Sequence, residues 1–170
     1  MKRAAALAIM LAVAGAGCGS KSPSSPSNQP TVFTVALKAS SEAPPVTNSE
    51  ANATGTAIIT INTVKDSAGN VTSGTIDFNV TMSGFPNGST ATMAHIHNAP
   101  TGVSGGVFVG VTPLSPGSPV QMPNGSGSFS FTGIDPGVDK INQILANPAG
   151  FYFNVHTTVN PNGAIRGQLK

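Results

Sequence analysis

The sequence predicts an all-β protein, an antiparallel Greek-key-like β-sandwich of about eight strands with at most one short helix. Only 8% of the 170 residues are charged, against roughly 25% in an average soluble domain, which leaves few charges for exposed helix faces. Glycine and proline occur 20 and 14 times and supply turns. Between these turns, short segments alternate apolar and polar residues, which is typical of half-buried strands.

The first part of the domain predicts three strands. Residues 31–39 alternate apolar and polar side chains, and residues 56–64 contain a run of β-branched residues. Residues 75–82 show the clearest alternation in the chain. Because a turn-like segment at residues 66–70 precedes this third strand, we expect the second and third strands to pair as a hairpin.

The second part predicts five more strands, at residues 91–97, 107–111, 128–132, 151–157 and 164–169. The last two flank the sequence Asn160-Pro161-Asn162-Gly163, in which Asn-Gly tolerates the positive φ of a tight turn. We therefore expect these two strands to form a second hairpin.

One helix interrupts the strands. Residues 138–145 place apolar side chains at helical spacing after Asp135-Pro136, and Asn147-Pro148 ends the pattern. The alternation in the strands also predicts the core. We expect eight side chains to be largely buried between two packed sheets: Phe33, Val35, Ile76, Phe78, Val80, Phe129, Phe151 and Phe153.

The N-terminus resembles a bacterial lipoprotein signal. Lys2 and Arg3 precede an apolar run of ten residues, Ala4–Val13, and small residues lead to Cys18. Such a run is too short to span a bilayer, which takes about 20 residues. We expect a signal peptide at residues 1–18 ending at a lipidated Cys18, a Ser/Pro-rich tether at 19–30 and one domain at 31–170. The alternative is an ordinary signal peptide cleaved nearby, with Cys18 discarded or free.

These segments imply an exported protein of the bacterial cell envelope, anchored by lipid in the outer membrane or at the cell surface. Cys18 is the only cysteine, so no intrachain disulfide can form. The formal net charge of +2 comes from Lys2 and Arg3, because the rest of the chain holds six basic and six acidic residues. Without a basic patch, the protein is not expected to bind nucleic acid.

The three histidines are the strongest candidates for chemistry. His95 and His97 are two apart on a predicted strand, so both leave the same face, together with Met93. His156 lies on another predicted strand, on the face of Tyr152 and Asn154. Three imidazoles brought together on a sheet can bind copper or zinc. The alternative is that these histidines are structural residues bonding loops at one end of the sandwich.

As a hypothesis, His95, His97 and His156 converge at one end of the sandwich and bind one copper or zinc ion. Met93 could offer a soft sulfur to Cu(I). Tyr152 and Asn154 are the expected partners that hold the histidine rings in place.

No catalytic residue is predicted. Gly102–Gly106 fits G-x-S-x-G, but a strand rather than the required helix is expected after it. Glu42 and Asp77 are not brought together by their spacing, and acids in this chain are expected at caps, turns and solvated faces. Arg166 could contact an anion, although a lone arginine on a strand more often serves as a structural donor.

Several motifs, in order, resemble the chordin (CHRD) domain family over about residues 32–169. They are Glu42-Ala43-Pro44-Pro45-Val46, Ala94-His95-Ile96-His97 with a glycine-rich loop after it, Asn154-Val155-His156-Thr157, and Asn160-Pro161-x-Gly163-x-Ile165-Arg166-Gly167-Gln168-Leu169. Ala164 and Asn98 depart from the residues usual in that family. The resemblance implies an all-β extracellular or envelope domain, in a family whose bacterial members mostly lack an assigned activity.

A weaker similarity links the His-x-His strand and the late Val-His to part of the copper site of Cu/Zn superoxide dismutases. The chain has no fourth histidine and no cysteine pair. Two functional classes follow. The first is a non-enzymatic envelope module that binds a protein, a glycan or a metal. The alternative is a metal-dependent redox enzyme of the superoxide dismutase type.

Overall fold

The computed structural model describes residues 28–111 and 119–170, which form an all-β fold as the sequence predicts. All strand pairings in this part of the chain are antiparallel. The described strands are β1 (Thr31–Lys38), β2 (Thr54–Lys65), β3 (Val71–Ser83), β4 (Ser89–Asn98), β5 (Gly106–Gly110), β6 (Val120–Met122), β7 (Gly127–Ile134), β8 (Phe151–Thr157) and β9 (Ile165–Gln168).

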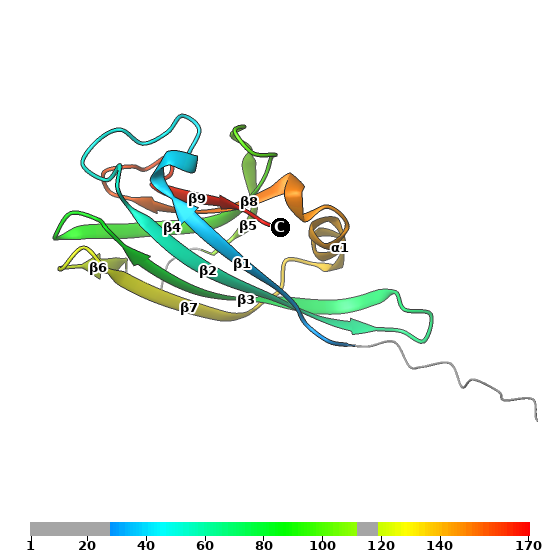
Figure 1. Cartoon of the computed structure of the whole chain (residues 1–170). Helices are drawn as coiled ribbons and strands as arrows, with labels where there is room; N and C mark the ends of the chain where they lie inside the picture. The colour runs from blue at the N-terminus through cyan, green and yellow to red at the C-terminus, as the bar shows by residue number, and fades with distance from the viewer. Residues whose placement is uncertain (1–27, 112–118) are drawn as a thin grey trace, which may run out of the picture.

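The strands form one sheet that curls back on itself, in the order β5-β4-β8-β9-β1-β2-β3-β7, with β6 paired to β4 (Figure 1). β1 and β9 pair in register only at Lys38 and Arg166. This short junction divides the sheet into two halves that enclose the core. The halves correspond to the two predicted layers, and the structure connects them into a continuous sheet.

All eight predicted strands are present, with ends shifted by a few residues. The short strand β6 was not predicted, because three residues are too few to show a period of two. The β2–β3 hairpin is longer than expected and projects beyond the body of the molecule (Figure 1). Its turn is closed by Asp66, whose side chain accepts hydrogen bonds from the backbone N–H groups of Ala68 and Asn70.

The predicted helix is α1 (Val138–Ala146), which lies at one open end of the curled sheet (Figure 1). Its buried Ile141 packs over Gly74 of β3, where a Cβ atom would come within 2.9 Å of the Ile141 side chain. There are also two short 3-10 helices. η1 (Ala39–Ser41) begins the connection from β1 to β2, and η2 (Pro148–Gly150) directly precedes β8. Among the described helices, none is long and apolar enough to cross a membrane.

The core contains the eight residues predicted from the alternation, and each is at most 7% exposed. Phe78 of β3 and Phe153 of β8 stack with ring centroids 5.7 Å apart, so side chains from the two halves of the sheet meet directly. One cluster of apolar side chains includes residues from both halves. The period-2 prediction of the core is therefore confirmed.

The outer faces of the two halves differ. On the β1–β2 side, Val32 and Ile58 point outward and are 54% and 43% exposed. In β8, by contrast, all seven residues are buried. Phe151, Phe153 and Val155 belong to the apolar core, so the residues that alternate with them face outward and are covered by loops.

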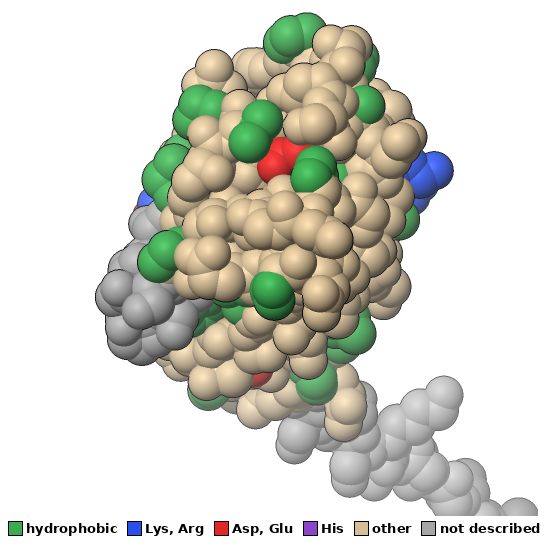
Figure 2. Space-filling model, turned by 90° about the vertical axis from the view of Figure 1, so that its left-hand side faces the viewer, with side chains coloured by type: hydrophobic (Ala, Val, Ile, Leu, Met, Phe, Trp, Pro, Cys, Tyr) green, Lys and Arg blue, Asp and Glu red, His purple; other side chains and the backbone are tan. Residues whose placement is uncertain are grey.

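The surface is poor in charge, as the composition requires. Figure 2 shows one face of the molecule with few acidic or basic side chains and no visible histidine. Buried polar side chains lie instead on the outer face of β4, β8 and β9, beneath the loops that cover it.

Candidate metal centre

The sheet brings the three histidines together on its outer face. His95 and His97 of β4 alternate with the core residues Ala94 and Ile96. In the β4–β8 register, His95 lies opposite Asn154, His97 opposite Tyr152 and Met93 opposite His156. The side-chain period and the register together therefore produce the cluster. The cluster lies on the outer face of the sheet, beneath loops, rather than at an end of the sandwich as expected. The reason is that each histidine occupies a strand position next to a core residue and therefore points away from the core.

The histidine side chains are close enough to share one ion. One nitrogen from each of His95, His97 and His156 lies within 4.8 Å of the other two. Two nitrogens bound at about 2.1 Å to the same ion are at most about 4.2 Å apart, so the three nitrogens lie close to the spacing that a shared ion requires. The three side chains are only 6–7% exposed.

Backbone carbonyls determine which ring nitrogens are free. His97 Nδ1 lies 2.9 Å from the carbonyl oxygen of Gly105, and His156 Nδ1 lies 2.9 Å from that of Pro161. A carbonyl oxygen only accepts hydrogen bonds, so each Nδ1 carries the proton. In the neutral rings, Nε2 of His97 and of His156 then carries a lone pair.

These lone pairs face the centre of the cluster. His156 Nε2 lies 3.1 Å from His95 Nδ1. His97 Nε2 is buried and has no hydrogen-bond partner among the described residues. A buried acceptor without a partner costs free energy, and coordination to a metal ion would satisfy it. The donor set and this unpaired nitrogen fit a metal bound by three imidazoles.

The two residues predicted to hold the rings contact them. Tyr152 stacks on His97, with ring centroids 4.7 Å apart and 3° between the ring planes. The Tyr152 hydroxyl accepts a hydrogen bond from Gly105 N at 3.3 Å, and Gly105 also supplies the carbonyl that binds His97. Asn154 presents its Oδ1 to His156 Nε2 at 3.1 Å. Because the Nδ1 proton of His156 goes to the Pro161 carbonyl, a hydrogen bond at Nε2 requires the Asn154 amide to turn over and present Nδ2.

Met93 lies directly across from His156 in the strand register and is half-buried. A β-bulge interrupts the pairing between Ala91 and Met93, but from Met93 onward the register is regular. Directly opposite residues have Cβ atoms about 5 Å apart. The strand register therefore places the soft donor Met93 beside this cluster.

Burial keeps the imidazoles neutral. It lowers the pKa of His95 to about 4, and the neighbouring His156 and His97 lower it further by charge repulsion. Burial also lowers the pKa of His97 and of His156, while their bonds to backbone carbonyls oppose the shift. Neutral imidazole is the form that binds a metal ion, so no proton has to be removed at neutral pH.

Sequence reasoning missed the role of Glu42, which was expected in a cap, a turn or a solvated face. The structure buries it at 8% exposure beside Arg166 and Asn154. Burial raises the pKa of Glu42 to about 7, against the opposing effect of the Arg166 charge. A solvated face was expected because an isolated acid carries no sign of the loop that will cover it. Its place in the Glu-x-Pro-Pro-Val motif was the available signal.

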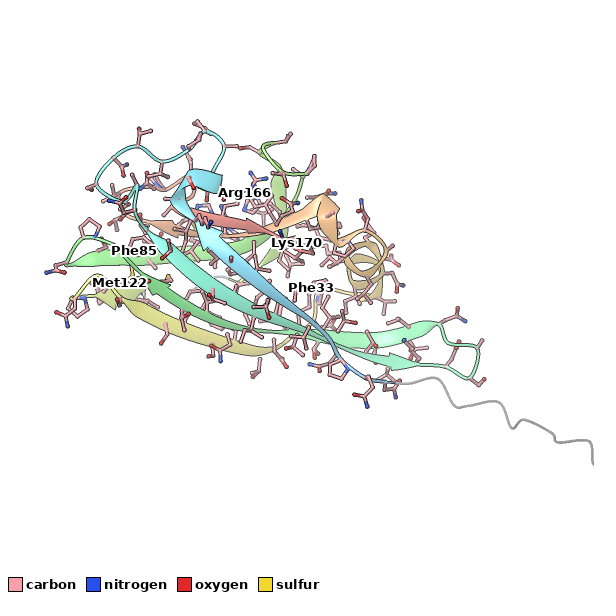
Figure 3. All side chains as sticks on the ribbon, in the orientation of Figure 1. Phe33, Phe85, Met122, Arg166 and Lys170 are labelled. Carbon is pink, nitrogen blue, oxygen red and sulfur yellow. The ribbon has the colours of Figure 1, made fainter. Side chains whose placement is uncertain are left out.

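Arg166 is a structural donor, 2% exposed, on β9 close to η1 (Figure 3). Its Nη2 donates to the carbonyl oxygen of Pro100 at 3.0 Å, and its Cζ lies 3.3 Å from the centroid of the Tyr152 ring. Asp77 lies apart from Glu42. Its carboxylate accepts hydrogen bonds from Asn62 and from the backbone of Gly133.

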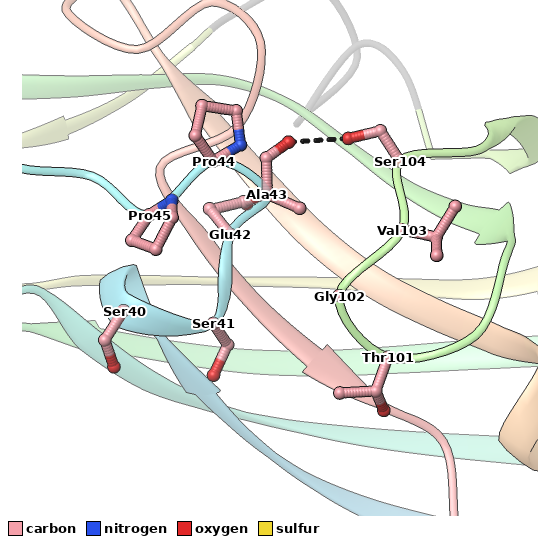
Figure 4. A pocket seen from close by; sticks show the side chains of 10 residues that line it. All are labelled: Ser40, Ser41, Glu42, Ala43, Pro44, Pro45, Thr101, Gly102, Val103 and Ser104. Carbon is pink, nitrogen blue, oxygen red and sulfur yellow. Dashed lines mark hydrogen bonds between the residues drawn. The ribbon is translucent and has the colours of Figure 1, made fainter.

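A cavity of about 730 Å³ lies between the loops Ser40–Pro45 and Thr101–Ser104 (Figure 4). Ser104 Oγ donates to the carbonyl oxygen of Ala43 at 2.6 Å and ties the two loops together. Ser104 is the serine of the G-x-S-x-G match. The next element is β5 and not a helix, so this segment does not form a nucleophile elbow.

Comparison with known proteins identifies the family. A model of the CHRD domain matches residues 33–169. Searches of curated proteins and of solved structures give no match. The matched region includes the whole described sheet from Phe33 onward, the three histidines and the loops that cover them. The chain therefore belongs to the CHRD domain family.

Proposed function

We propose that this CHRD-domain protein is an envelope-anchored lipoprotein that acts as a non-enzymatic metal-binding module, with one copper or zinc ion held by His95, His97 and His156. The observation that supports this most directly is the buried, unpaired Nε2 of His97, which faces two other imidazoles. The backbone carbonyls at His97 and His156 preset the tautomers that a metal needs.

The donor set limits the choice of metal. Three neutral imidazoles suit Cu(II) or Zn(II), and Met93 opposite His156 would add a thioether to Cu(I). A structural zinc site is almost always four-coordinate with nitrogen, oxygen or thiolate ligands, so for Zn(II) a fourth ligand such as water would come from outside the chain.

Enclosure favours binding over catalysis. The histidines are 6–7% exposed, and Tyr152, Asn154 and Arg166 around them are at most 3% exposed. A substrate of ordinary size would have to displace these groups. Superoxide is small enough to be the exception, so a redox enzyme of the superoxide dismutase type is the second candidate, supported by the three clustered imidazoles.

The metal proposal is tested by calorimetry on EDTA-treated protein, with CuCl₂ and ZnCl₂ as separate titrants. We expect one equivalent of at least one metal to bind, and His97→Ala or His156→Ala to abolish that binding. Unchanged binding in both variants would rule out this site. A superoxide assay on the metal-loaded protein separates the two candidates, because turnover above that of free metal favours the enzyme.

The anchor is proposed from the sequence, since residues 1–27 lie outside the described part of the chain. We expect the mature protein, made in a bacterium, to begin at a lipidated Cys18. Intact-mass analysis of the detergent-extracted protein measures this directly. Cys18→Ser should remove the lipid mass and release the protein from membranes, whereas an unmodified N-terminus elsewhere would contradict the proposal.

A further inference from the structure

Glu50 is a fully buried carboxylate in the loop between β1 and β2, with 0% exposure. Its Oε2 accepts two short hydrogen bonds, from Thr157 Oγ1 at 2.6 Å and from Asn160 Nδ2 at 2.6 Å. Its Oε1 is buried without a hydrogen-bond partner among the described residues. Burying a carboxylate with one unpaired oxygen costs free energy, so the burial of Glu50 calls for a structural reason. The two hydrogen bonds that it makes indicate this reason.

Those bonds hold the turn that follows β8. Asn160 is its centre, because Asn160 N donates to Thr157 Oγ1 and the Asn160 carbonyl accepts from Thr157 N and Gly163 N. The side chains of Asn48 and Asn160 also bond each other, at 2.9 and 3.3 Å. Glu50 therefore fixes both the last residue of β8 and the middle of the turn.

The same turn supplies the anchor of a histidine. Pro161 follows Asn160 directly, and its carbonyl oxygen accepts the Nδ1 proton of His156 at 2.9 Å. If the turn moved, Nδ1 would lose this acceptor, and the proton could instead occupy Nε2, the nitrogen that faces His95. The hydrogen bonds thus connect Glu50 to the lone pair of His156 without direct contact.

The loop between β1 and β2 also holds the far end of this turn. A Cβ atom built at Gly163 would lie 2.6 to 2.8 Å from the carboxylate atoms of Glu42, so that carboxylate packs directly on Gly163. Glu50 and Glu42 therefore hold opposite ends of the turn, and Pro161 lies between them.

We infer that Glu50 is a positioning residue of the histidine centre: through Thr157 and Asn160 it fixes the Pro161 carbonyl and keeps the His156 proton on Nδ1, so that Nε2 has a lone pair to offer a metal ion. The effect on metal affinity rests on the proposed function, whereas the effect on the His156 tautomer does not. Glu50→Gln is the closest variant, because the amide keeps the size but gives up the charge that strengthens both bonds.

The experiment combines two measurements on wild type, Glu50→Gln and Thr157→Val. ¹⁵N NMR of the imidazole rings in the metal-free protein reports the tautomer of His156, and calorimetry with ZnCl₂ reports affinity. We expect His156 to be protonated on Nδ1 in wild type and on a mixture of nitrogens in both variants. Zinc affinity should fall about tenfold, the lower end of what loss of such supporting contacts costs.

Two controls separate positioning from general destabilisation. Asp77→Asn removes the charge of another carboxylate that accepts two hydrogen bonds, from Asn62 and Gly133, and should leave affinity and tautomer unchanged. In the same spectra, Glu50→Gln should leave His97 protonated on Nδ1, because that proton is held by the Gly105 carbonyl and not by the turn that Glu50 bonds.

The inference fails if folded Glu50→Gln and Thr157→Val both keep the Nδ1 tautomer of His156 and wild-type zinc affinity. It also fails if Glu50→Gln changes the tautomer of His97 as much as that of His156. If Glu50→Gln does not fold, Thr157→Val alone decides. If wild type binds no metal, the proposed function is wrong, and the tautomer measurement still decides whether Glu50 positions His156.

Discussion

The ring of Tyr152 lies flat against the imidazole of His97. The guanidinium of Arg166 also lies against the Tyr152 ring, with its Cζ 3.3 Å from the centroid of that ring. Two groups this close cannot share one face, so the Tyr152 ring is enclosed between an imidazole and a cation. Tyr152 is the only tyrosine, and the chain has no tryptophan. Its fluorescence therefore reports on the histidine centre alone.

Copper binding should quench this fluorescence. If Cu²⁺ binds at His97, the stacked Tyr152 ring is in direct contact with a ligand of a paramagnetic ion. We expect quenching that saturates at one equivalent of CuCl₂ in a fluorescence titration. His97→Ala should remove the saturable phase, and a linear, non-saturating decrease in wild type would contradict the prediction.

Gly163→Ala should destabilise the protein by about 2 kcal/mol, because backbone strain and a steric clash act together. Gly163 has φ of 132°, and the added Cβ would meet the Glu42 carboxylate at 2.6 Å. Urea denaturation measures the loss.

Gly102→Ala is the matched control for this substitution. Gly102 has a positive φ of 79° but open space around its Cβ position, so only backbone strain, about 1 kcal/mol, is expected. Equal losses at the two positions would show that the Glu42 contact has no part in the effect.

Glu42 should make the metal-free protein less stable as the pH rises. Its pKa is raised from 4.5 to about 7 by burial, so the folded state holds the proton more tightly than the unfolded state. This contribution is fully present below pH 4.5 and is lost as the pH rises through 7. We expect Glu42→Gln to gain on the order of 1 to 3 kcal/mol relative to wild type between pH 4.5 and 8.

The measurement is urea denaturation with EDTA at each pH, compared between the two proteins. Comparing the change with pH removes any constant effect of the substitution on packing. Parallel stability curves for wild type and Glu42→Gln would show that this carboxyl titrates equally in the folded and unfolded states.

The three histidines should make the metal-free protein less stable as the pH falls, the opposite of the effect of Glu42. The pKa of His95 is lowered from 6.5 to about 4, and the pKa values of His97 and His156 are also lowered, so the unfolded state binds protons first. Their contribution is present above pH 6.5 and is lost as the pH falls through the folded-state values.

His95→Asn should therefore reduce the acid sensitivity of the metal-free protein. Relative to wild type, we expect a gain on the order of 1 to 3 kcal/mol between pH 7 and 4, as a large shift at one site implies. Chemical denaturation in EDTA at several pH values provides the test. If the free energy of unfolding falls equally between pH 7 and 4 in wild type and His95→Asn, His95 is not the source of the acid sensitivity.

The spacing of apolar residues, two in strands and three or four in the helix, was enough to predict every described strand but β6, the helix α1 and the core. Phe78 and Phe153 come from segments 75 residues apart, yet each could be placed inside because the strand period is two and the apolar face is unambiguous. The same period placed His95 and His97 on one face and His156 on the face of Tyr152 and Asn154. β6 could not be found this way, because it has only three residues.

The sequence by itself thus determined the fold class, the inward-facing residues and the side of each strand that carries a histidine, because these depend on local periodicity. Only the tertiary structure decided that β4 pairs with β8 in the register that joins the histidines, and that loops cover this outer face. It also decided the burial of Glu42 and Glu50. Strand order and loop burial arise from contacts between distant segments, and a carboxylate in a polar loop has no local pattern that distinguishes a buried position from a solvated one.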